Sequence, residues 1–160
     1  MQIYLLRHAI AEDPKPGVPD AERPLTSEGA RKLRDILKRA MGGGLDPTKI
    51  LASPFRRAME TANLAAKALD FHQPIITTKT LVPSSIAQET WDEIRLYKGE
   101  PSLLLVGHEP AMGQLTGYLL AVPELQIDFK KGAMVRIDVP SLGLRPRGVL
   151  KWMLAPKLAG

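Results

Sequence analysis

The chain predicts an α/β protein, a three-layer α/β/α sandwich with a mostly parallel central sheet. Short apolar runs alternate along the chain with longer segments in which apolar residues recur at helical spacing. Three of the apolar runs end abruptly in polar or cationic side chains, as strands do at the rim of such a sheet. The length of 160 residues suits one domain, residues 1–160.

The composition excludes several classes of protein. Hydrophobic residues make up 44% and charged residues 24% of the chain, which is ordinary for a globular protein. There is no cysteine, which excludes a disulfide framework, a thiolate metal site and a cysteine nucleophile. No apolar run approaches the ~18 residues of a membrane span, and the N-terminus enters a strand without a leader pattern. We therefore expect a cytoplasmic protein with no membrane association.

The charge balance is basic, with a net charge of +5 and a pI of about 9.6. Such a balance can indicate nucleic-acid binding. The basic residues are, however, spread along the chain, and aromatic residues are only 5%, too few for a stacking platform. We expect no nucleic-acid partner, because a protein that handles small anions has the same balance.

The first strand covers residues 2–8, because an apolar run there ends in Arg7 and His8. Residues 12–24 hold four prolines and one glycine, which predicts a stiff loop. That loop is either a lid over a nearby site or a plain surface connection.

A helix begins at Thr26-Ser27-Glu28, where hydroxyl caps precede an early acid. It ends at Gly42-Gly43-Gly44, which opens a turn. Its buried face carries four apolar residues at helical spacing: Ala30, Leu33, Leu37 and Met41. The basic residues between them predict a solvated face.

A short strand, Lys49 to Ala52, leads into a second helix. We expect this helix to begin at Ser53-Pro54, with a hydroxyl cap and a proline in its first position. Its buried stripe follows the helical period: Phe55, Ala58, Ala62, Ala65 and Leu69.

The rest of the chain continues the alternation. Leu103 to Val106 is a continuous apolar run, which predicts a strand buried on both faces. Two late segments alternate in polarity on either side of a turn, and they predict an antiparallel pair. The expected elements are a strand near Pro74–Ile76, an irregular stretch at 80–88, helices at Glu89–Lys98 and from Pro110 to about Ala121, and strands at Ala133–Val139 and Gly148–Leu154.

Three strand ends share one design. The first closes with Arg7-His8, the second passes through Ser53 to Arg57 into a helix, and the third closes with Gly107-His108-Glu109-Pro110 before another helix. Parallel strands bring their carboxyl ends to one edge of the sheet, so these groups can converge. Two histidines and two arginines at such an edge predict an anion site with a nucleophile in it.

The choice between Arg56 and Arg57 follows from helix geometry. Successive helical residues point about 100° apart, so only one of the two can face the ligand. Arg56 lies four residues before Glu60, which offers it a surface ion pair. Arg57 lies in the first turn, where the helix dipole already favours an anion. We predict that Arg57 faces the site.

The chain resembles the histidine phosphatase superfamily, which has the phosphoglycerate-mutase-like fold. It is most similar to the small SixA-type phosphohistidine phosphatase branch. Four segments carry the resemblance, in the family's order: Leu6-Arg7-His8-Ala9, Arg23-Pro24-Leu25-Thr26-Ser27-Glu28-Gly29, Ser53-Pro54-Phe55-Arg56-Arg57-Ala58-Met59-Glu60-Thr61 and Val106-Gly107-His108-Glu109-Pro110. The resemblance implies that residues 1–160 form a single histidine phosphatase domain.

The family pattern makes His8 the nucleophile that becomes phosphorylated. It makes Arg7 and Arg57 the groups that bind the phosphoryl oxygens, and His108 a second histidine that hydrogen-bonds the same group. We expect a structural role for the segment that starts at Arg23. Phosphoryl transfer needs mainly positioning and electrostatic support, which arginines supply without a metal. We therefore expect no metal and no cofactor.

A proton donor for the leaving group is not assigned by the pattern. The candidates are Glu12, Asp13, Glu89 and Glu109, and each also fits a plain solvated carboxylate. Three roles are open for Glu109: it repels phosphate, points outward or donates a proton. An imidazole can be protonated before it departs, whereas an alkoxide needs help in the transition state. A missing acid therefore favours a phosphohistidine substrate.

Three functions are compatible with these residues. The first is a metal-independent phosphatase that acts on phosphohistidine of a protein. The second is a phosphomonoesterase of small metabolite phosphates, and the third is a non-catalytic module that binds phosphorylated partners. The expected partner is a phosphorylated protein or a small phosphate substrate, and the expected oligomeric state is a monomer.

Overall fold

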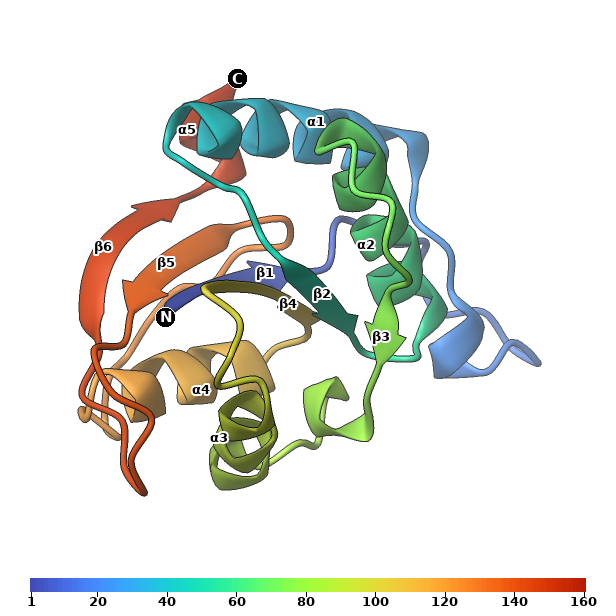
Figure 1. Ribbon diagram of the computed structural model, residues 1–160. Coiled ribbons are helices and arrows are strands. Elements are labelled where there is room, and N and C mark those ends of the chain that lie inside the picture. The colour runs from blue at the N-terminus through green and yellow to red at the C-terminus, as the bar shows by residue number, and fades with distance from the viewer.

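A six-stranded sheet with the strand order β3-β2-β4-β1-β5-β6 lies between two layers of helices (Figure 1). The computed structural model describes residues 1–160. The elements follow one another as β1 (Gln2–Arg7), η1 (Asp20–Glu22), α1 (Ser27–Gly42), β2 (Lys49–Ala52), α2 (Arg56–Ala68), β3 (Ile76–Thr77), η2 (Lys79–Leu81), α3 (Ala87–Leu96), β4 (Ser102–Gly107), α4 (Ala111–Leu119), β5 (Met134–Asp138), β6 (Val149–Leu154) and α5 (Pro156–Ala159).

The sheet is parallel in the half that carries the predicted site. β1 pairs with β4, β4 with β2 and β2 with β3, all in parallel, whereas β5 and β6 add an antiparallel pair on the other side of β1. The register sets Arg7 opposite Gly107 and Ala52 opposite Val106. The three strand ends singled out in the sequence are therefore level with one another at one edge.

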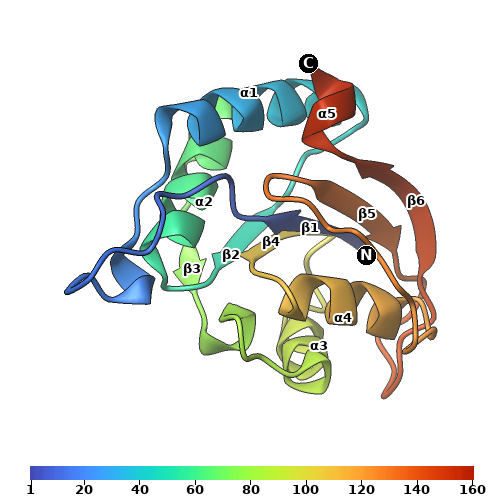
Figure 2. The same cartoon turned by 180° about the vertical axis from the view of Figure 1, so that it is seen from behind.

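The two helix layers cover opposite faces of the sheet. Helices α1, α2 and α5 lie on one face, and α3 and α4 lie on the other (Figures 1 and 2). Alternate residues of β1 contribute to two separate apolar cores, with Tyr4 and Leu6 under α1 and α2, and Ile3 and Leu5 under α3 and α4. This is the period of two that a strand buried on both faces requires. The predicted three-layer α/β/α sandwich is confirmed.

The first helix follows its predicted bounds but not its whole predicted face. The Thr26 hydroxyl accepts a hydrogen bond from the Gly29 backbone N–H, which caps α1 as expected. Met41, expected on the buried face, is 43% exposed, so that prediction was wrong. The buried stripe instead runs through Ile36 and Ala40, because one residue beyond Ala40 the helix has already turned toward solvent.

The second helix starts later than predicted. Ser53 and Pro54 precede α2 as a turn, and the helix begins at Arg56 with Phe55 as its N-cap. The Ser53 hydroxyl accepts from the backbone N–H of Phe55 instead of capping the helix. Ser53 is completely buried at the end of β2, and its side chain does not cap α2.

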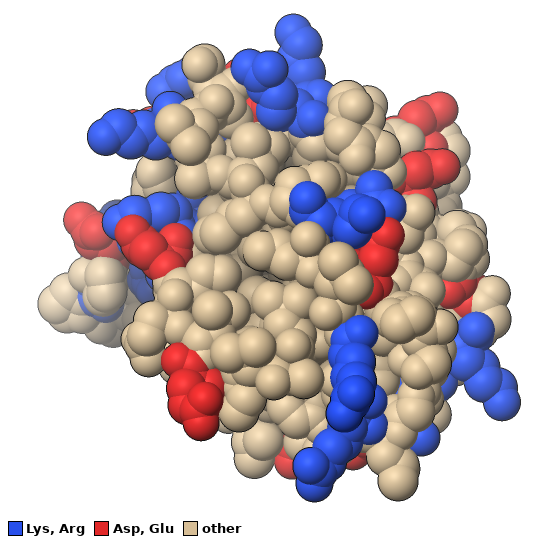
Figure 3. Space-filling model, turned by 90° about the vertical axis from the view of Figure 1, so that its left-hand side faces the viewer, with Lys and Arg blue, Asp and Glu red and all other residues tan.

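The third helix also differs, beginning at Ala87 rather than Glu89. At the far side of the sheet, β6 is an edge strand with several exposed apolar residues, including Val149 and Leu150. Figure 3 looks onto this side and shows mostly neutral surface between separated charged side chains. The antiparallel strands thus extend the sheet, whereas the deeply buried part, and the predicted site, belong to the parallel strands.

Candidate active site at the carboxyl edge of the parallel strands

His8 follows β1 directly and is only 5% exposed. Its Nδ1 lies 2.7 Å from the carbonyl oxygen of Ala9, and because a carbonyl can only accept, Nδ1 carries the hydrogen. The lone pair of the neutral ring is therefore on Nε2. That atom accepts a hydrogen bond from Arg57 Nε at 3.4 Å. Nε2 is thus the ring atom available to attack an electrophile.

The protonation state of His8 suits that role. Burial is the largest cause that lowers the pKa of His8, and the positive charges of Arg57, Arg7 and Lys131 act in the same direction. Against the hydrogen bond to Ala9, which raises it, the pKa of His8 is lowered to about 4. The ring is accordingly neutral at pH 7. Burial contributes more to this lowered pKa than the neighbouring guanidinium groups do.

Arg57 reaches His8 from the first turn of α2 and is 4% exposed. Its neighbour Arg56 points outward, where its Nε donates to Glu60 Oε2 at 3.1 Å. The structure therefore brings Arg57 to His8 and leaves Arg56 on the surface, as the helical offset of about 100° predicts. Phe55 packs against the other side of Arg57, with its ring centre 5.1 Å from the guanidinium carbon.

Asp20, which the sequence analysis did not select, also contacts Arg57. Its carboxylate accepts from Arg57 Nη2 at 3.1 Å, and its backbone oxygen accepts from Nη1 at 2.7 Å. Arg23 holds the same carboxylate through its Nε at 2.9 Å. Burial opposes ionisation of Asp20, but the hydrogen bonds from Arg23 and Arg57 outweigh it and lower its pKa. No local pattern in the proline-rich loop could have identified this contact.

His108 follows β4 and is 1% exposed, with its ring centre 5.0 Å from that of His8. Its Nε2 lies 2.8 Å from the hydroxyl of Ser53. That hydroxyl already accepts from Phe55 N–H, so its own hydrogen can be donated to His108 Nε2. In that arrangement Nδ1 of His108 carries a hydrogen, and this nitrogen is buried without a hydrogen-bond partner in the protein.

His108 is also neutral at pH 7. The pKa of His108 is lowered to about 3, mainly by burial and also by the charges of His8 and Arg57. Ser53 was interpreted in the sequence as a helix cap, yet its burial and its bond to His108 make it part of the site. The sequence feature that could have identified Ser53 as a site residue is its position directly after the end of β2.

Arg7 is the last residue of β1 and directly precedes His8. Its Nη1 donates to the backbone oxygen of Phe129 at 2.7 Å, whereas its Nε is buried with no partner in the protein. Burial lowers the pKa of Arg7, although the carboxylates of Glu109 and Asp128 act in the opposite direction. The turn that contains Phe129 closes over the strand end, because Gly132 N–H donates to the backbone oxygens of both Arg7 and His8.

The segment from Arg23 to Gly29 holds the chain that follows His8, in agreement with the structural role expected for it. Arg23 Nη1 donates to the backbone oxygen of Glu12 at 2.8 Å, and Thr26 N–H donates to that of Ile10 at 2.9 Å. A Cβ at Gly29 would lie 2.3 Å from the Ile10 oxygen, so only glycine allows this approach.

Thr61 connects α2 to the same stretch of chain. Its hydroxyl accepts from the Ala9 backbone N–H at 3.1 Å and donates to the backbone oxygen of Arg57 at 2.6 Å. The backbone that follows His8 and the first turn of α2 are therefore fixed to each other. Ala9 itself is 2% exposed and packs into the core beneath α1 and α2.

None of the four carboxylates named as candidate proton donors has a hydrogen bond or ion pair to His8, Arg57 or His108. Glu12 lies 3.5 Å from Lys15 and, with Asp13, lines a surface groove. Glu89 is exposed on α3. Glu109 accepts from Gly113 N–H, and burial raises its pKa, with the hydrogen bond and the charge of Arg7 acting against that shift.

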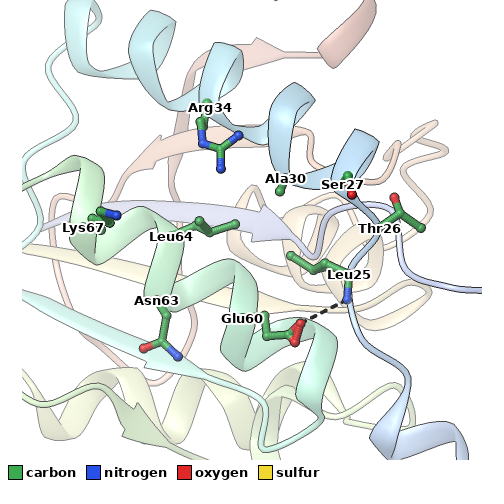
Figure 4. A pocket seen from close by; sticks show the side chains of 9 residues that line it. All are labelled: Leu25, Thr26, Ser27, Ala30, Arg34, Glu60, Asn63, Leu64 and Lys67. Carbon is green, nitrogen blue, oxygen red and sulfur yellow. Dashed lines mark hydrogen bonds between the residues drawn. The ribbon is translucent and has the colours of Figure 1, made fainter.

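Other features lie apart from this constellation. A groove of about 620 Å³ runs between α1 and α2, and it contains none of the predicted site residues (Figure 4). Glu60 lines it and accepts from the Leu25 backbone N–H, which further secures the segment that starts at Arg23. No group of three or more histidine or carboxylate side chains is placed to hold a metal ion. None of the helices has the length and apolar character needed to span a bilayer.

Comparisons with known proteins identify the family of the chain. A model of the histidine phosphatase superfamily (branch 1) matches residues 3–83. An uncharacterised protein of Picosynechococcus is 35% identical over 115 residues, which cover 71% of this chain and 70% of the relative. The phosphohistidine phosphatase SixA of Escherichia coli is 25% identical over 163 residues, covering 98% and 94% of the two chains.

The fold has a close counterpart among solved structures. The protein histidine phosphatase SixA, solved in complex with tungstate, matches with a TM-score of 0.85 and 23% identity. The match covers 98% of each chain. The predicted phosphoglycerate-mutase-like architecture of the SixA type is therefore confirmed over the whole length.

Proposed function

The chain belongs to the histidine phosphatase superfamily, and from this premise we propose that it is a metal-independent phosphatase that passes the phosphoryl group through His8. We propose further that its substrate is phosphohistidine of a protein. Four side chains carry the proposed reaction: Arg7, His8, Arg57 and His108.

The observation that carries the proposal is the environment of one atom. His8 Nε2 holds the lone pair of a neutral, buried ring and faces the guanidinium of Arg57 at 3.4 Å. Arg7 Nε and His108 Nδ1 are buried polar atoms with no partner in the protein. Buried polar groups of this kind are normally satisfied, so two of them close to His8 indicate a site for an oxyanion.

The reaction divides into two transfers at phosphorus. In the first, the Nε2 lone pair forms a bond to phosphorus while the bond from phosphorus to the leaving nitrogen breaks, and the leaving imidazole keeps its proton. In the second, a water oxygen forms a bond to phosphorus while the bond from phosphorus to Nε2 breaks, and one water proton passes to solvent. Inorganic phosphate and the neutral ring are released. The arginines and His108 hold the equatorial oxygens in both steps, which is the main requirement of phosphoryl transfer.

The lack of an engaged acid supports phosphohistidine over an ester. Asp20 contacts the site through Arg57; it is bound by Arg23 and Arg57 and has a lowered pKa, so it is a poor proton donor. An alkoxide leaving group needs a donor in the transition state, whereas an imidazole does not. The likeness to a curated phosphohistidine phosphatase over 98% of this chain points the same way.

The test combines a rapid quench with a substrate panel. We expect an acid-labile, base-stable phosphoryl label on wild-type protein and none on His8→Ala. Phosphate release from a phosphohistidine protein should exceed release from phosphoserine peptides and sugar phosphates by at least about tenfold in kcat/KM, a difference of about 1.4 kcal/mol.

Each alternative has its own result. Efficient ester hydrolysis without activity on phosphohistidine would identify a phosphomonoesterase of small metabolites instead. In that case, single replacement of Glu12, Asp13, Glu89 and Glu109 should reveal the required donor. Binding of phosphoprotein without any label or turnover would identify a non-catalytic module.

A further inference from the structure

A groove of about 460 Å³ opens beside Arg7. Its walls come from α1, from the turn before β5 and from the start of α5, which are far apart in the sequence. We call it the lysine groove, after its four lysines: Lys32, Lys130, Lys131 and Lys157. Arg7 and Asp128 also line it.

The charge of the lysine groove is strongly positive. Asp128 is its only carboxylate, and it already pairs with Lys130 at 3.0 Å. Lys32 pairs with Glu28 at 3.0 Å outside the groove, whereas Lys131 and Lys157 form no ion pair with any carboxylate. Lys130, Lys131 and Lys157 are exposed, and the ammonium groups of Lys131 and Lys157 are available to a partner.

The groove is also linked to the site around His8 through Arg7, the chain neighbour of His8, which lines the groove. Arg7 belongs to both, and the charge of Lys131 acts on His8 itself, where it lowers the pKa. When a macromolecule delivers a phosphoryl group to His8, the surface around that phosphoryl group would therefore contact these lysines. No residue of the α1–α2 groove has such a link to the pocket.

We propose that the lysine groove docks an acidic surface that flanks the phosphohistidine of the substrate protein. The inference rests on the proposed function, and it adds how the substrate protein is selected. Complementary charge accelerates association and orients the partner, which suits a turnover in which the phosphoryl group must enter a small pocket. The groove has no aromatic lining, which disfavours single-stranded nucleic acid as its occupant.

The test compares two substrates in a triple variant, K32A/K130A/K157A. Lys131 is retained because its charge also acts on His8. The protein substrate is a histidine phosphotransfer domain of net negative charge, phosphorylated chemically with phosphoramidate, and the small substrate is free phosphohistidine. A second triple variant, K38A/K98A/K151A, removes the same charge from exposed lysines outside the groove and serves as the control.

We expect the groove variant to lower the ratio of kcat/KM for the protein to kcat/KM for free phosphohistidine by at least about tenfold, and the control variant by less than about twofold. Added salt should weaken wild-type turnover of the protein more than that of the variant, because exposed charges are screened. Unchanged turnover of free phosphohistidine shows that the variant is folded.

The outcomes separate the two proposals. If wild type hydrolyses the phosphorylated domain and the ratio is the same in all three proteins, the docking inference is overturned while the proposed function stands. If wild type turns over neither phosphohistidine substrate, the proposed function itself fails. If the groove variant loses only affinity for a single-stranded oligonucleotide, the groove serves nucleic acid and the docking inference is wrong.

Discussion

At the scale of single residues, the chemistry of His8 depends on which ring nitrogen carries the proton and on how reluctant the ring is to take a second one. The Ala9 carbonyl fixes the proton on Nδ1, and burial with neighbouring cations suppresses protonation of Nε2. These two effects act on different atoms of one ring. Together they leave a lone pair facing Arg57 throughout the neutral pH range.

The first prediction concerns this titration. In a wild-type NMR experiment on ring-labelled histidine, His8 should titrate at about pH 4 rather than near 6.5. Arg57→Ala removes a positive neighbour and exposes the ring to water, so the midpoint should rise. A wild-type midpoint near 6.5 for His8 would contradict the burial argument.

The second prediction concerns Ser53 as a positioning residue. Ser53→Ala removes the hydroxyl that bonds to His108 Nε2, so the tautomer with hydrogen on Nδ1 loses its support. We expect kcat on free phosphohistidine to fall about tenfold, the size of one lost buried hydrogen bond. The ¹⁵N shifts of His108 should change at the same time, which a purely structural role of Ser53 would not require. Unaltered shifts with an unaltered kcat would exclude this role.

At the scale of elements, the N-terminal turn of α1 is docked on the chain that leaves the nucleophile. Thr26 caps the helix and bonds to Ile10, and Gly29 approaches the Ile10 backbone too closely for any side chain. The contact explains why a helix 20 residues away in sequence matters to His8. It also gives a physical reason for the glycine of this motif.

The third prediction tests that contact. Gly→Ala normally stabilises a helix by up to about 1 kcal/mol, but Gly29→Ala places a Cβ 2.3 Å from the Ile10 oxygen. We expect it to destabilise the protein by about 1–3 kcal/mol, with a Tm several degrees lower. Gly42→Ala, at the open end of the same helix, is the matched control and should be neutral or stabilising. Equal Tm values for the two variants would disprove the close approach.

At the scale of the whole molecule, two neutral histidines are buried at the rim of the sheet. The folded protein keeps both uncharged even at pH values somewhat below the ordinary pKa of histidine. Their pKa values are about 4 and about 3 in the folded protein, whereas an unfolded histidine titrates near 6.5. The unfolded chain therefore binds more protons than the folded one between these values. Stability must rise with pH across that window.

The fourth prediction follows from this sign. The free energy of unfolding should fall as the pH is lowered from about 6.5 toward 4, with a slope of up to about 1.4 kcal/mol per pH unit for each histidine. The double variant His8→Asn/His108→Asn removes both groups and should flatten this part of the curve. Urea unfolding measured at several pH values provides the slopes. The same slope in both proteins would show that other groups dominate.

The sequence predicted those features that depend on local pattern. Apolar runs identified β1, β2 and β4, and the helical offset selected Arg57 over Arg56. The exposure of Met41 and the start of α2 were predicted wrongly. Packing decides how far a helix rotates at its end, and it decides which of two partners the Ser53 hydroxyl binds. Asp20 carried no signal at all, since its partner Arg57 lies 37 positions along the chain.

The amino-acid sequence by itself determined the layered α/β architecture and the identity of the cationic and histidine side chains at three strand ends, because periodicity and strand endings are local properties. The tertiary structure alone decided that burial, more than charge, keeps His8 neutral, that Ser53 turns toward His108, and that lysines from three separate segments line one groove. Burial, hydrogen-bond partners and charge density all depend on distances between remote residues, and only the folded chain sets those distances.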